Sequence, residues 1–453
     1  TRIYNIFNAS PYERTENVEI TVWDWSNNDL PLMEFCDANG NVIPHLLLNS
    51  GTEWYWFHDF VTVLLKVTVP ACGYTTYTLQ KSDSSLTGMV YGEPGEWQQV
   101  EVPHEYLLEN KNIRAEFDVH TGAVTSIMDK KTGAELLRKG EFCGFRLVYE
   151  DTDRGMTAWR VGRHMSIKQF DEVHIKPIRY SGAPLRKAIS IDSKWNRSSL
   201  SAVIYLDEES TELMFSVNCD WHEKGQPGEK MPQLNFIVPI AAKCKAYKFD
   251  VPAGVTRREP VDMDLPGNSF ICAVSEESSQ GIMLSSDTKY GYRGFDNSVA
   301  VNLIRASYDP DPQPEYGMHK IKLSVGVIDS SCNTGLIKKA YSLWHPLNSV
   351  ASSAHIGELP LSMSFMEIKS GDIALSAVKM PENGERAVIF RVYDTSGNGT
   401  EGVISFIQEP KTAVRTDIHE MNEYSSDCKL SINGNDLILG LSKGSFITIK
   451  VNF

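Results

Sequence analysis

The chain has 453 residues, more than one ordinary hydrophobic core accommodates, so two to four domains are expected. Hydrophobic residues make up 42% and charged residues 23%, a balance that excludes a largely disordered chain. The formal net charge of −14 argues against nucleic acid or anionic lipid as a partner, and no apolar run approaches the roughly 20 residues of a membrane span. We therefore expect no nucleic-acid partner and no membrane partner.

Apolar and polar residues alternate along most of the chain, as they do in strands with one buried face. The pattern begins at Val18, Ile20 and Val22, recurs from residue 63 to 69, and returns from residue 447 to 453. Between such runs stand turn signals, because Gly and Asn tolerate the positive φ angles of tight turns. These are Asn39-Gly40, Thr121-Gly122, Ser396-Gly397 and Asn433-Gly434. The pattern predicts an all-β protein made of sandwiches.

One helix is predicted from Thr334 to Trp344, where Leu336, Ala340 and Leu343 share one face and Pro346 stops the run. A second break in the alternation lies at residues 81–96. We therefore expect a small β-sandwich domain at 1–90, a large β domain at 91–348 and a C-terminal β-sandwich domain at 349–453. The chain opens with Thr1 in a strand-like segment, without initiator Met or signal segment, which predicts a fragment of a longer protein.

Eight cysteines are scattered singly, and no CxxC pair of the kind used in zinc ribbons occurs. Cys143, Cys219 and Cys272 lie in apolar, strand-like runs, where a free thiol behaves as a small buried hydrophobe. Reduced core cysteines are typical of a reducing compartment, so we expect a cytoplasmic protein.

The segment Asp220-Trp221-His222-Glu223 places Asp220 and His222 on the same face of a strand, where they could bind a metal ion. Two ligands do not make a site, and no second His-rich element has matching spacing. We therefore favour a structural, hydrogen-bonded turn over metal binding.

Three carboxylates fall within four positions at Glu150, Asp151 and Asp153. Paired carboxylates are the groups that glycoside hydrolysis uses. Adjacent acids in a loop are more often solvated or paired with arginine, here Arg154 or Arg160, and we favour that alternative.

The segment from Tyr290 to Phe295, Tyr-Gly-Tyr-Arg-Gly-Phe, combines aromatic rings with an arginine. Aromatic faces stack on sugars, and arginine donates a fork of hydrogen bonds to hydroxyl groups. A packed β-turn with core tyrosines is an equal alternative. No P-loop, GxSxG, HExxH or dinucleotide-binding motif accompanies it.

Several segments resemble, in order and spacing, the carboxy-terminal region of glycoside hydrolase family 38, the class II α-mannosidases. The first are Tyr4 to Arg14, the turn Val69-Pro70-Ala71-Cys72-Gly73-Tyr74, and the strand pair that begins at Leu108-Glu109-Asn110. Further along are Glu150-Asp151 with Ala158-Trp159, Asp220-Trp221-His222-Glu223, Lys289-Tyr290-Gly291-Tyr292, Leu303-Ile304-Arg305-Ala306-Ser307 and Gly317-Met318-His319. Thr157 departs from the pattern, since the family commonly has an acid there.

The resemblance implies a large galactose-mutarotase-like supersandwich flanked by smaller β-sandwich domains. It implies that the catalytic residues and a zinc ion belong to an amino-terminal α/β barrel, so that this chain carries no catalytic residue and no metal ligand. The parent would be a retaining α-mannosidase acting on an oligosaccharide or mannoside. This half would support and partly wall the active site, with Tyr290, Tyr292, Arg293 and Arg305 as candidates for substrate binding. Its partners would be the amino-terminal catalytic domain and, because family members self-associate, a second copy.

Two other functions compete with this one. A free-standing carbohydrate-binding module would bind glycan by itself. An aldose epimerase, which uses the same kind of sandwich, would need a convergent pair of histidines and a glutamate base.

Overall fold

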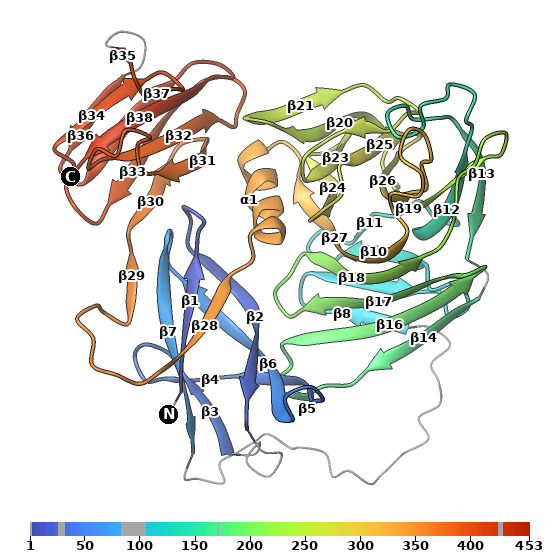
Figure 1. The fold of residues 1–453 in the computed structure, drawn as a ribbon, viewed down its shortest axis with the longest axis horizontal. Coiled ribbons are helices and arrows are strands. Elements are labelled where there is room, and N and C mark those ends of the chain that lie inside the picture. The colour runs from blue at the N-terminus through green and yellow to red at the C-terminus, as the bar shows by residue number, and fades with distance from the viewer. Residues whose placement is uncertain (1, 26–31, 83–105, 171, 425–428) are drawn as a thin grey trace. The chain divides into compact units, whose positions relative to one another are not determined.

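The computed structural model describes residues 2–25, 32–82, 106–170, 172–424 and 429–453. Within these ranges the chain consists of antiparallel strands and one α-helix, which confirms the predicted all-β class. It divides into two compact units (Figure 1). The first unit comprises Thr1–Glu96, Tyr180–Leu185 and His345–Phe453, and the second comprises Trp97–Arg179 and Arg186–Trp344.

The first unit contains two pairs of sheets. One sheet has the order β28 (Asn348–Ser353), β1 (Arg2–Asn8), β7 (Gly73–Lys81), β3 (Met33–Cys36) and β4 (Val42–Ile43), with β29 (Ser362–Ser364) paired to β7. The next has the order β15 (Ser181–Gly182), β5 (His45–Glu53), β6 (His58–Val69) and β2 (Arg14–Trp23). The alternation predicted for β2 is observed, since Val18, Ile20 and Val22 are buried in the core between these sheets.

The last part of the chain forms the other pair. One sheet has the order β30 (Met366–Ser370), β33 (Thr400–Phe406), β37 (Asp436–Leu441) and β36 (Leu430–Asn433). The other has the order β31 (Ile373–Lys379), β32 (Val388–Asp394), β38 (Phe446–Asn452), β34 (Thr412–Thr416) and β35 (Glu423–Tyr424). Ile447, Ile449 and Val451 of β38 are buried in a separate apolar core, as their alternation predicts.

The second unit is built on two large sheets. A six-stranded sheet has the order β13 (His164–Gln169), β12 (Gly144–Glu150), β19 (Met231–Pro239), β26 (Ser298–Arg305), β25 (Gly291–Phe295) and β22 (Leu265–Pro266). A nine-stranded sheet has the order β14 (Val173–Ile178), β16 (Arg186–Trp195), β17 (Ser198–Asp207), β18 (Glu212–Trp221), β27 (Gly317–Asp329), β24 (Gln280–Ser286), β23 (Phe270–Ser275), β20 (Cys244–Val251) and β21 (Gly254–Arg258). A smaller sheet has the order β11 (Ala134–Glu135), β10 (Val124–Asp129), β9 (Ile113–Phe117) and β8 (Tyr106–Glu109).

The large sheets pack face to face through one apolar core. Phe145 and Phe236 of the six-stranded sheet lie against Phe215 of the nine-stranded sheet, with ring centroids 6.2 Å and 4.9 Å away. Burying a side chain of this size stabilises the fold by roughly 1.5–3 kcal/mol. The second unit is therefore a large β-sandwich.

The predicted helix is observed as α1 (Asn333–Trp344). Its buried residues Leu336 and Ala340 pack with Phe270 and Met283, which belong to β23 and β24, and Figure 1 shows α1 beside β24 and β27. The predicted turns are confirmed as well, because Gly40, Gly122, Gly397 and Gly434 all have positive φ angles.

The three-part domain division stays a prediction. Its first boundary, at residue 90, lies outside the described residues. Its second boundary, between residues 348 and 349, lies close to the division between the two units at Trp344 and His345. A contiguous division does not include the pairing of β15 with β5, which brings six residues from the middle of the chain into the first unit.

All seven cysteines among the described residues are free, and Cys143, Cys219 and Cys272 are buried as predicted. Burial raises the pKa of Cys219 and of Cys272 to about 12, whereas Cys332 is exposed. The thiolate is the reactive form, so a chromogenic disulfide reagent at about pH 8 should react quickly with one thiol of a Cys428→Ser protein. That fast phase should vanish when Cys332→Ser is added, and denaturing the Cys428→Ser protein should make all seven of its cysteines react. Several fast thiols in the native state would contradict this burial pattern.

Candidate functional site

The six-stranded sheet of the second unit has two unlike faces. In β19, Leu234 and Phe236 point into the apolar core, while Gln233 and Asn235 lie on the opposite face. The strand register places polar residues of β12, β25 and β26 beside them, and β13 and the segment before β22 add others. We call this set the polar face; its members are Arg146, Glu150, His164, Gln233, Asn235, Asp262, Asp264, Arg293, Asn302 and Arg305.

One end of the polar face is a fully bonded ion pair. The buried Glu150 carboxylate accepts hydrogen bonds from Arg305 Nε and Nη2 at 2.8 and 2.9 Å, from Gln233 Nε2 at 2.7 Å and from Gly162 N at 2.8 Å. Burial raises the pKa of Glu150, and the Arg305 guanidinium opposes that rise. Arg305 also donates to the carbonyl oxygens of Thr157 and Arg160, at 2.5 and 2.7 Å. This pair therefore ties the 151–163 loop to the sheet.

The other end is built around Arg293, whose side chain is 7% exposed. Its Nε donates to Asp264 Oδ1 at 2.7 Å, and its Nη1 donates to Asp262 Oδ1 at 2.5 Å. Asn302 Nδ2 donates to the second oxygen of Asp264 at 3.4 Å. Charge-assisted bonds of this kind hold the guanidinium in one orientation.

In the middle of the polar face, some buried polar atoms have no hydrogen-bond partner among the described residues. Asn235 Oδ1 accepts from Arg146 Nε at 2.9 Å, and Gln233 Nε2 lies 3.3 Å from His164 Nε2. Within the part of the chain that the structure describes, Gln233 Oε1, Asn235 Nδ2 and Arg293 Nη2 are buried and have no hydrogen-bond partner. A buried polar atom without a partner costs about 1–3 kcal/mol.

Protonation of His164 should weaken the fold. Burial first, and the nearby Arg293 and Arg146 guanidinium groups with it, lower the pKa of His164 to about 4, although Asp262 and Asp264 oppose them. An unfolded histidine titrates near pH 6.5, so the unfolded state binds protons more readily than the folded state. As the pH falls from about 6.5 to about 4, the wild type should lose on the order of 2 kcal/mol of stability relative to His164→Gln. Urea unfolding of both proteins across this range checks it; parallel pH profiles would contradict it.

The structure separates the four residues predicted to bind substrate. Arg293 and Arg305 lie on the polar face, each held by carboxylates. Tyr292 is fully buried in the sandwich core, where its partner in the register is Val301, so its ring packs as a core side chain. Tyr290 is 56% exposed and meets Trp344 edge-on, with ring centroids 6.1 Å apart. Gly294 lets Tyr247 approach, because a Cβ there would lie 2.4 Å from that ring.

The carboxylates of the Glu150 segment pair with arginine, as favoured, but the predicted partners were wrong. Glu150 binds Arg305, and Arg163 lies 2.6 Å from Asp151 and 3.4 Å from Asp153. Arg160 Nη1 donates instead to the backbone oxygen of Arg154 at 3.1 Å, and the backbone oxygen of Arg160 accepts from Arg305. Both true partners lie on other strands or further along the loop, which local spacing does not reveal.

Asp220 and His222 do meet on one face, with His222 Nε2 2.8 Å from Asp220 Oδ1. The His222 backbone N donates to Ser198 Oγ, and its ring meets Tyr316 edge-on at 4.5 Å. Among the residues described, no three His, Cys, Asp or Glu side chains gather closely enough to hold a metal ion. No described helix is long and apolar enough to cross a membrane.

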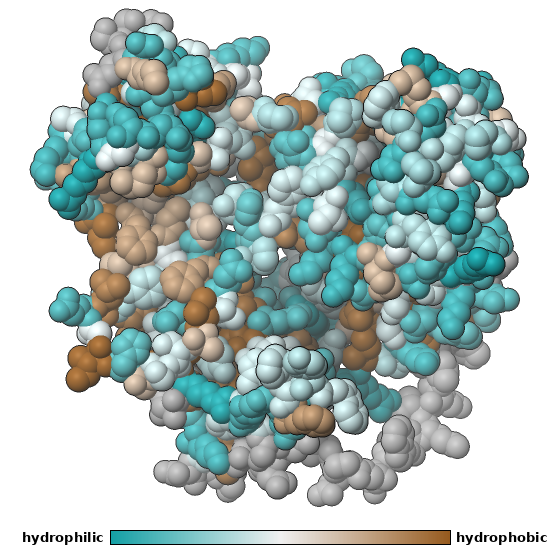
Figure 2. All heavy atoms as spheres, viewed as in Figure 1, coloured by the Kyte–Doolittle hydropathy of each residue, from teal (hydrophilic) through white to brown (hydrophobic). Residues whose placement is uncertain are grey.

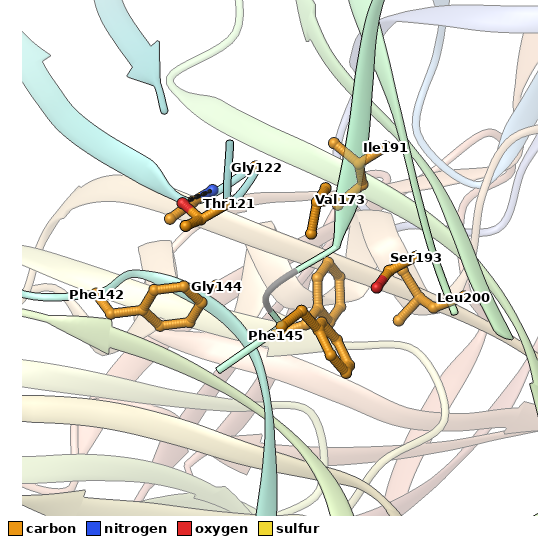
Figure 3. Close-up of a pocket in the computed structure, with 11 residues that line it drawn as sticks. Thr121, Gly122, Phe142, Gly144, Phe145, Val173, Ile191, Ser193 and Leu200 are labelled. Carbon is orange, nitrogen blue, oxygen red and sulfur yellow. Dashed lines mark hydrogen bonds between the residues drawn. The ribbon is translucent and has the colours of Figure 1, made fainter. Parts of the chain in front are cut away.

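A small recess lies elsewhere in the second unit (Figure 3). The recess is lined mainly by Phe142, Phe145, Val173, Ile191 and Leu200. Gly122 also lines it, at a position where a Cβ would lie 2.8 Å from the Val173 side chain. The volume of the recess, about 10 Å³, is far below the roughly 300–1,000 Å³ of ligand pockets, and its lining is mostly apolar. It offers little to orient a polar ligand.

The first unit exposes an unusual aromatic surface. Four consecutive residues at the turn between β5 and β6, Trp54 to Phe57, are each at least 68% exposed, and we call them the aromatic tip. The turn is ordered by Glu53, whose carboxylate accepts from Trp56 N and whose carbonyl accepts from Phe57 N, both at 2.8 Å. Figure 2 shows further hydrophobic surface over β1, β28 and β29 of the same unit, where Phe7, Val350 and Phe365 are about half exposed.

Sequence reasoning missed the aromatic tip and the middle of the polar face, although both left signals. The tip is a run of four aromatic residues, and an uninterrupted run of that kind is unusual for a hairpin turn. In β19, Gln233 and Asn235 alternate with Leu234 and Phe236, so one face of an otherwise apolar strand is polar.

Fold and surface together define a protein of several β-sandwiches, the largest of which carries a buried polar row. Comparison with known families narrows this class. The description "glycosyl hydrolases family 38 C-terminal domain" matches residues 108–313, and "glycosyl hydrolases family 38 C-terminal beta sandwich domain" matches residues 372–452. These ranges take in more than half of the chain. The chain belongs to glycosyl hydrolase family 38, as the carboxy-terminal region of that family.

Curated relatives agree with this assignment, and a solved structure shares the fold. The chain is 23% identical to α-mannosidase G of Dictyostelium discoideum, over 74% of this chain and 32% of that protein, and 23% identical to human α-mannosidase 2C1, over 79% and 34%. It therefore spans about a third of the length of the curated relatives it matches. An α-mannosidase structure from Enterococcus faecalis shares the fold, with a TM-score of 0.73 and 14% identity over 99% of this chain and 56% of that one.

Proposed function

We propose that this chain is the carboxy-terminal, non-catalytic half of a longer α-mannosidase, which removes α-linked mannose from oligosaccharides or other mannosides. The observation that carries the proposal is the order of the two family matches, which follow one another along the chain as two C-terminal domains. Relatives that bear the name α-mannosidase are more than twice as long as this chain.

In this proposal the chemistry belongs to the amino-terminal part of the longer protein. The resemblance implies a retaining mechanism, with a carboxylate nucleophile and a zinc ion that helps to bind and distort the sugar. Because the resemblance places the metal ligands and the nucleophile in that amino-terminal part, we assign no zinc ligand and no catalytic step to this chain. Of the four residues predicted to bind substrate, Tyr290 has the accessible ring that stacking on a glycan requires.

In this proposal, this half contributes β-sandwich domains that present a surface to the rest of the protein. Large aromatic side chains bury 150–250 Å² each, so the aromatic tip alone exceeds the few hundred Å² of apolar patch that monomers usually expose. We propose that the catalytic part of the same polypeptide covers the tip, since about two thirds of the length of the relatives lies outside the segment that matches this chain.

Replacing Trp54 and Trp56 with serine tests whether the rest of the intact protein covers the aromatic tip. In the isolated chain both rings are exposed, so stability should change by less than about 0.5 kcal/mol. In the intact protein, rings buried in an interface should cost about 2 kcal/mol or more when removed. Thermal unfolding of both proteins checks this, with the exposed Trp159→Ser as the matched control. Equal, small effects in both proteins would show that nothing covers the tip.

The proposed activity is tested on the intact protein. We expect it to hydrolyse p-nitrophenyl α-mannoside, and proton NMR of the first product should show the α-anomer, as retention requires. An intact protein that cleaves no α-mannoside would overturn the proposed activity, and a β-anomer as first product would overturn the mechanism.

A further inference from the structure

We propose that the middle of the polar face binds a neutral, polyhydroxylated ligand such as a sugar. The site consists of Gln233, Asn235 and Arg293, each of which has a buried polar atom without a hydrogen-bond partner among the described residues. Its border is formed by Arg146, His164 and Asn302. The inference does not depend on the proposed activity of the longer protein, because all these residues belong to the second unit of this chain.

The unpartnered atoms are fixed in identity by their neighbours. Asn235 Oδ1 must face Arg146, since a guanidinium donates and cannot accept, so the amide nitrogen is the atom left over. Gln233 Nε2 must face the Glu150 carboxylate for the converse reason, so its oxygen is left over. Arg293 Nη2 remains because Nε and Nη1 are engaged by aspartates. The site thus presents two donors and one acceptor.

Such a set matches a hydroxyl group. A hydroxyl group complements each of these atoms, because its oxygen accepts from an amide or guanidinium nitrogen and its hydrogen is donated to an amide oxygen. A molecule with several hydroxyl groups could then reach Asn302, His164 and Arg146, all of which are partly exposed. A single buried water could satisfy the same atoms and is the competing occupant.

The charges of the polar face select a neutral ligand. Three guanidinium groups, Arg146, Arg293 and Arg305, are matched by three carboxylates, Glu150, Asp262 and Asp264. Neither a phosphate nor an amine would gain net attraction from this balance. Neutral sugars carry many hydroxyl groups and no charge, so they fit both requirements.

Calorimetric titration of this chain with mannose and glucose tests the inference, with mannose 6-phosphate and glucuronate as charged comparisons. We expect dissociation constants on the order of millimolar for at least one neutral sugar and at least about 10-fold weaker binding of its charged counterpart. Asn235→Asp keeps the oxygen that faces Arg146 but replaces the free donor by an acceptor, so binding should weaken by about 10-fold or more. Asn218→Asp, an exposed site on β18, is the matched control and should bind like the wild type.

A crystal of the wild-type chain soaked in the sugar that binds gives a second measurement if Asn235→Asp fails to fold. Sugar density on Gln233, Asn235 and Arg293 supports the inference. It is overturned if the neutral sugars do not bind, if charged sugars bind equally well, if Asn235→Asp binds like the wild type, or if the soaked crystal holds only water at these atoms. An intact protein without mannosidase activity would leave this result unchanged, so the two proposals fail separately.

Discussion

Replacing Arg305 with methionine should lower the free energy of unfolding of the second unit by about 3–5 kcal/mol. The substitution removes the partner of Glu150, which is fully buried and depends on Arg305 for two of its hydrogen bonds. It also frees the 151–163 loop, because the bonds from Arg305 to Thr157 and Arg160 are lost. Urea unfolding followed by tryptophan fluorescence measures the change.

Two comparisons make this result specific. Lys111→Met removes an exposed pair with Glu209, of similar length at 2.8 Å, and should cost less than about 1 kcal/mol. The cost of Arg305→Met should also shrink as the pH falls, because burial raises the pKa of Glu150 and a protonated Glu150 no longer leaves a bare charge in the core. Equal losses for Arg305→Met and Lys111→Met would show that the buried pair does not anchor this face.

The substitution Tyr292→Ala should destabilise the second unit by about 3–5 kcal/mol, whereas Tyr290→Ala should cost less than about 1 kcal/mol. The two tyrosines stand two positions apart in one motif, but Tyr292 is fully buried and Tyr290 is 56% exposed. Removing the buried ring leaves a cavity in the core, and removing the exposed ring leaves none. Thermal unfolding of the two variants measures the difference.

The same pair distinguishes packing from substrate contact in the intact protein. A loss of kcat/KM in Tyr290→Ala with unchanged stability would support its proposed contact with the glycan. A stable Tyr292→Ala protein with lowered kcat/KM would contradict the packing role that the structure gives that ring.

Local sequence predicted much of this fold because its signals are local. The alternation in β2, β6 and β38, the turn at Asn433-Gly434 and the helix α1 each depend on residues within a few positions of one another. The pairing of β15 with β5 joins residues more than a hundred positions apart, and no local pattern marks it.

The candidate site was harder to predict because its contacts join residues that lie far apart in the sequence. Whether Tyr292 or Arg293 faces the core depends on the register between β25 and β26, where Tyr292 lies opposite Val301. Glu150 and Arg305 are far apart in sequence and meet only because β19 lies between their strands, paired with both. The incomplete middle of the polar face emerges only when the hydrogen bonds of three neighbouring strands are considered together.

The most direct test is an assay of this polypeptide alone against p-nitrophenyl α-mannoside, with and without added zinc. Because we place the catalytic groups on the part of the protein that precedes these sandwiches, we predict no hydrolysis above the uncatalysed background under either condition. Sustained release of nitrophenol by the isolated chain would contradict the account.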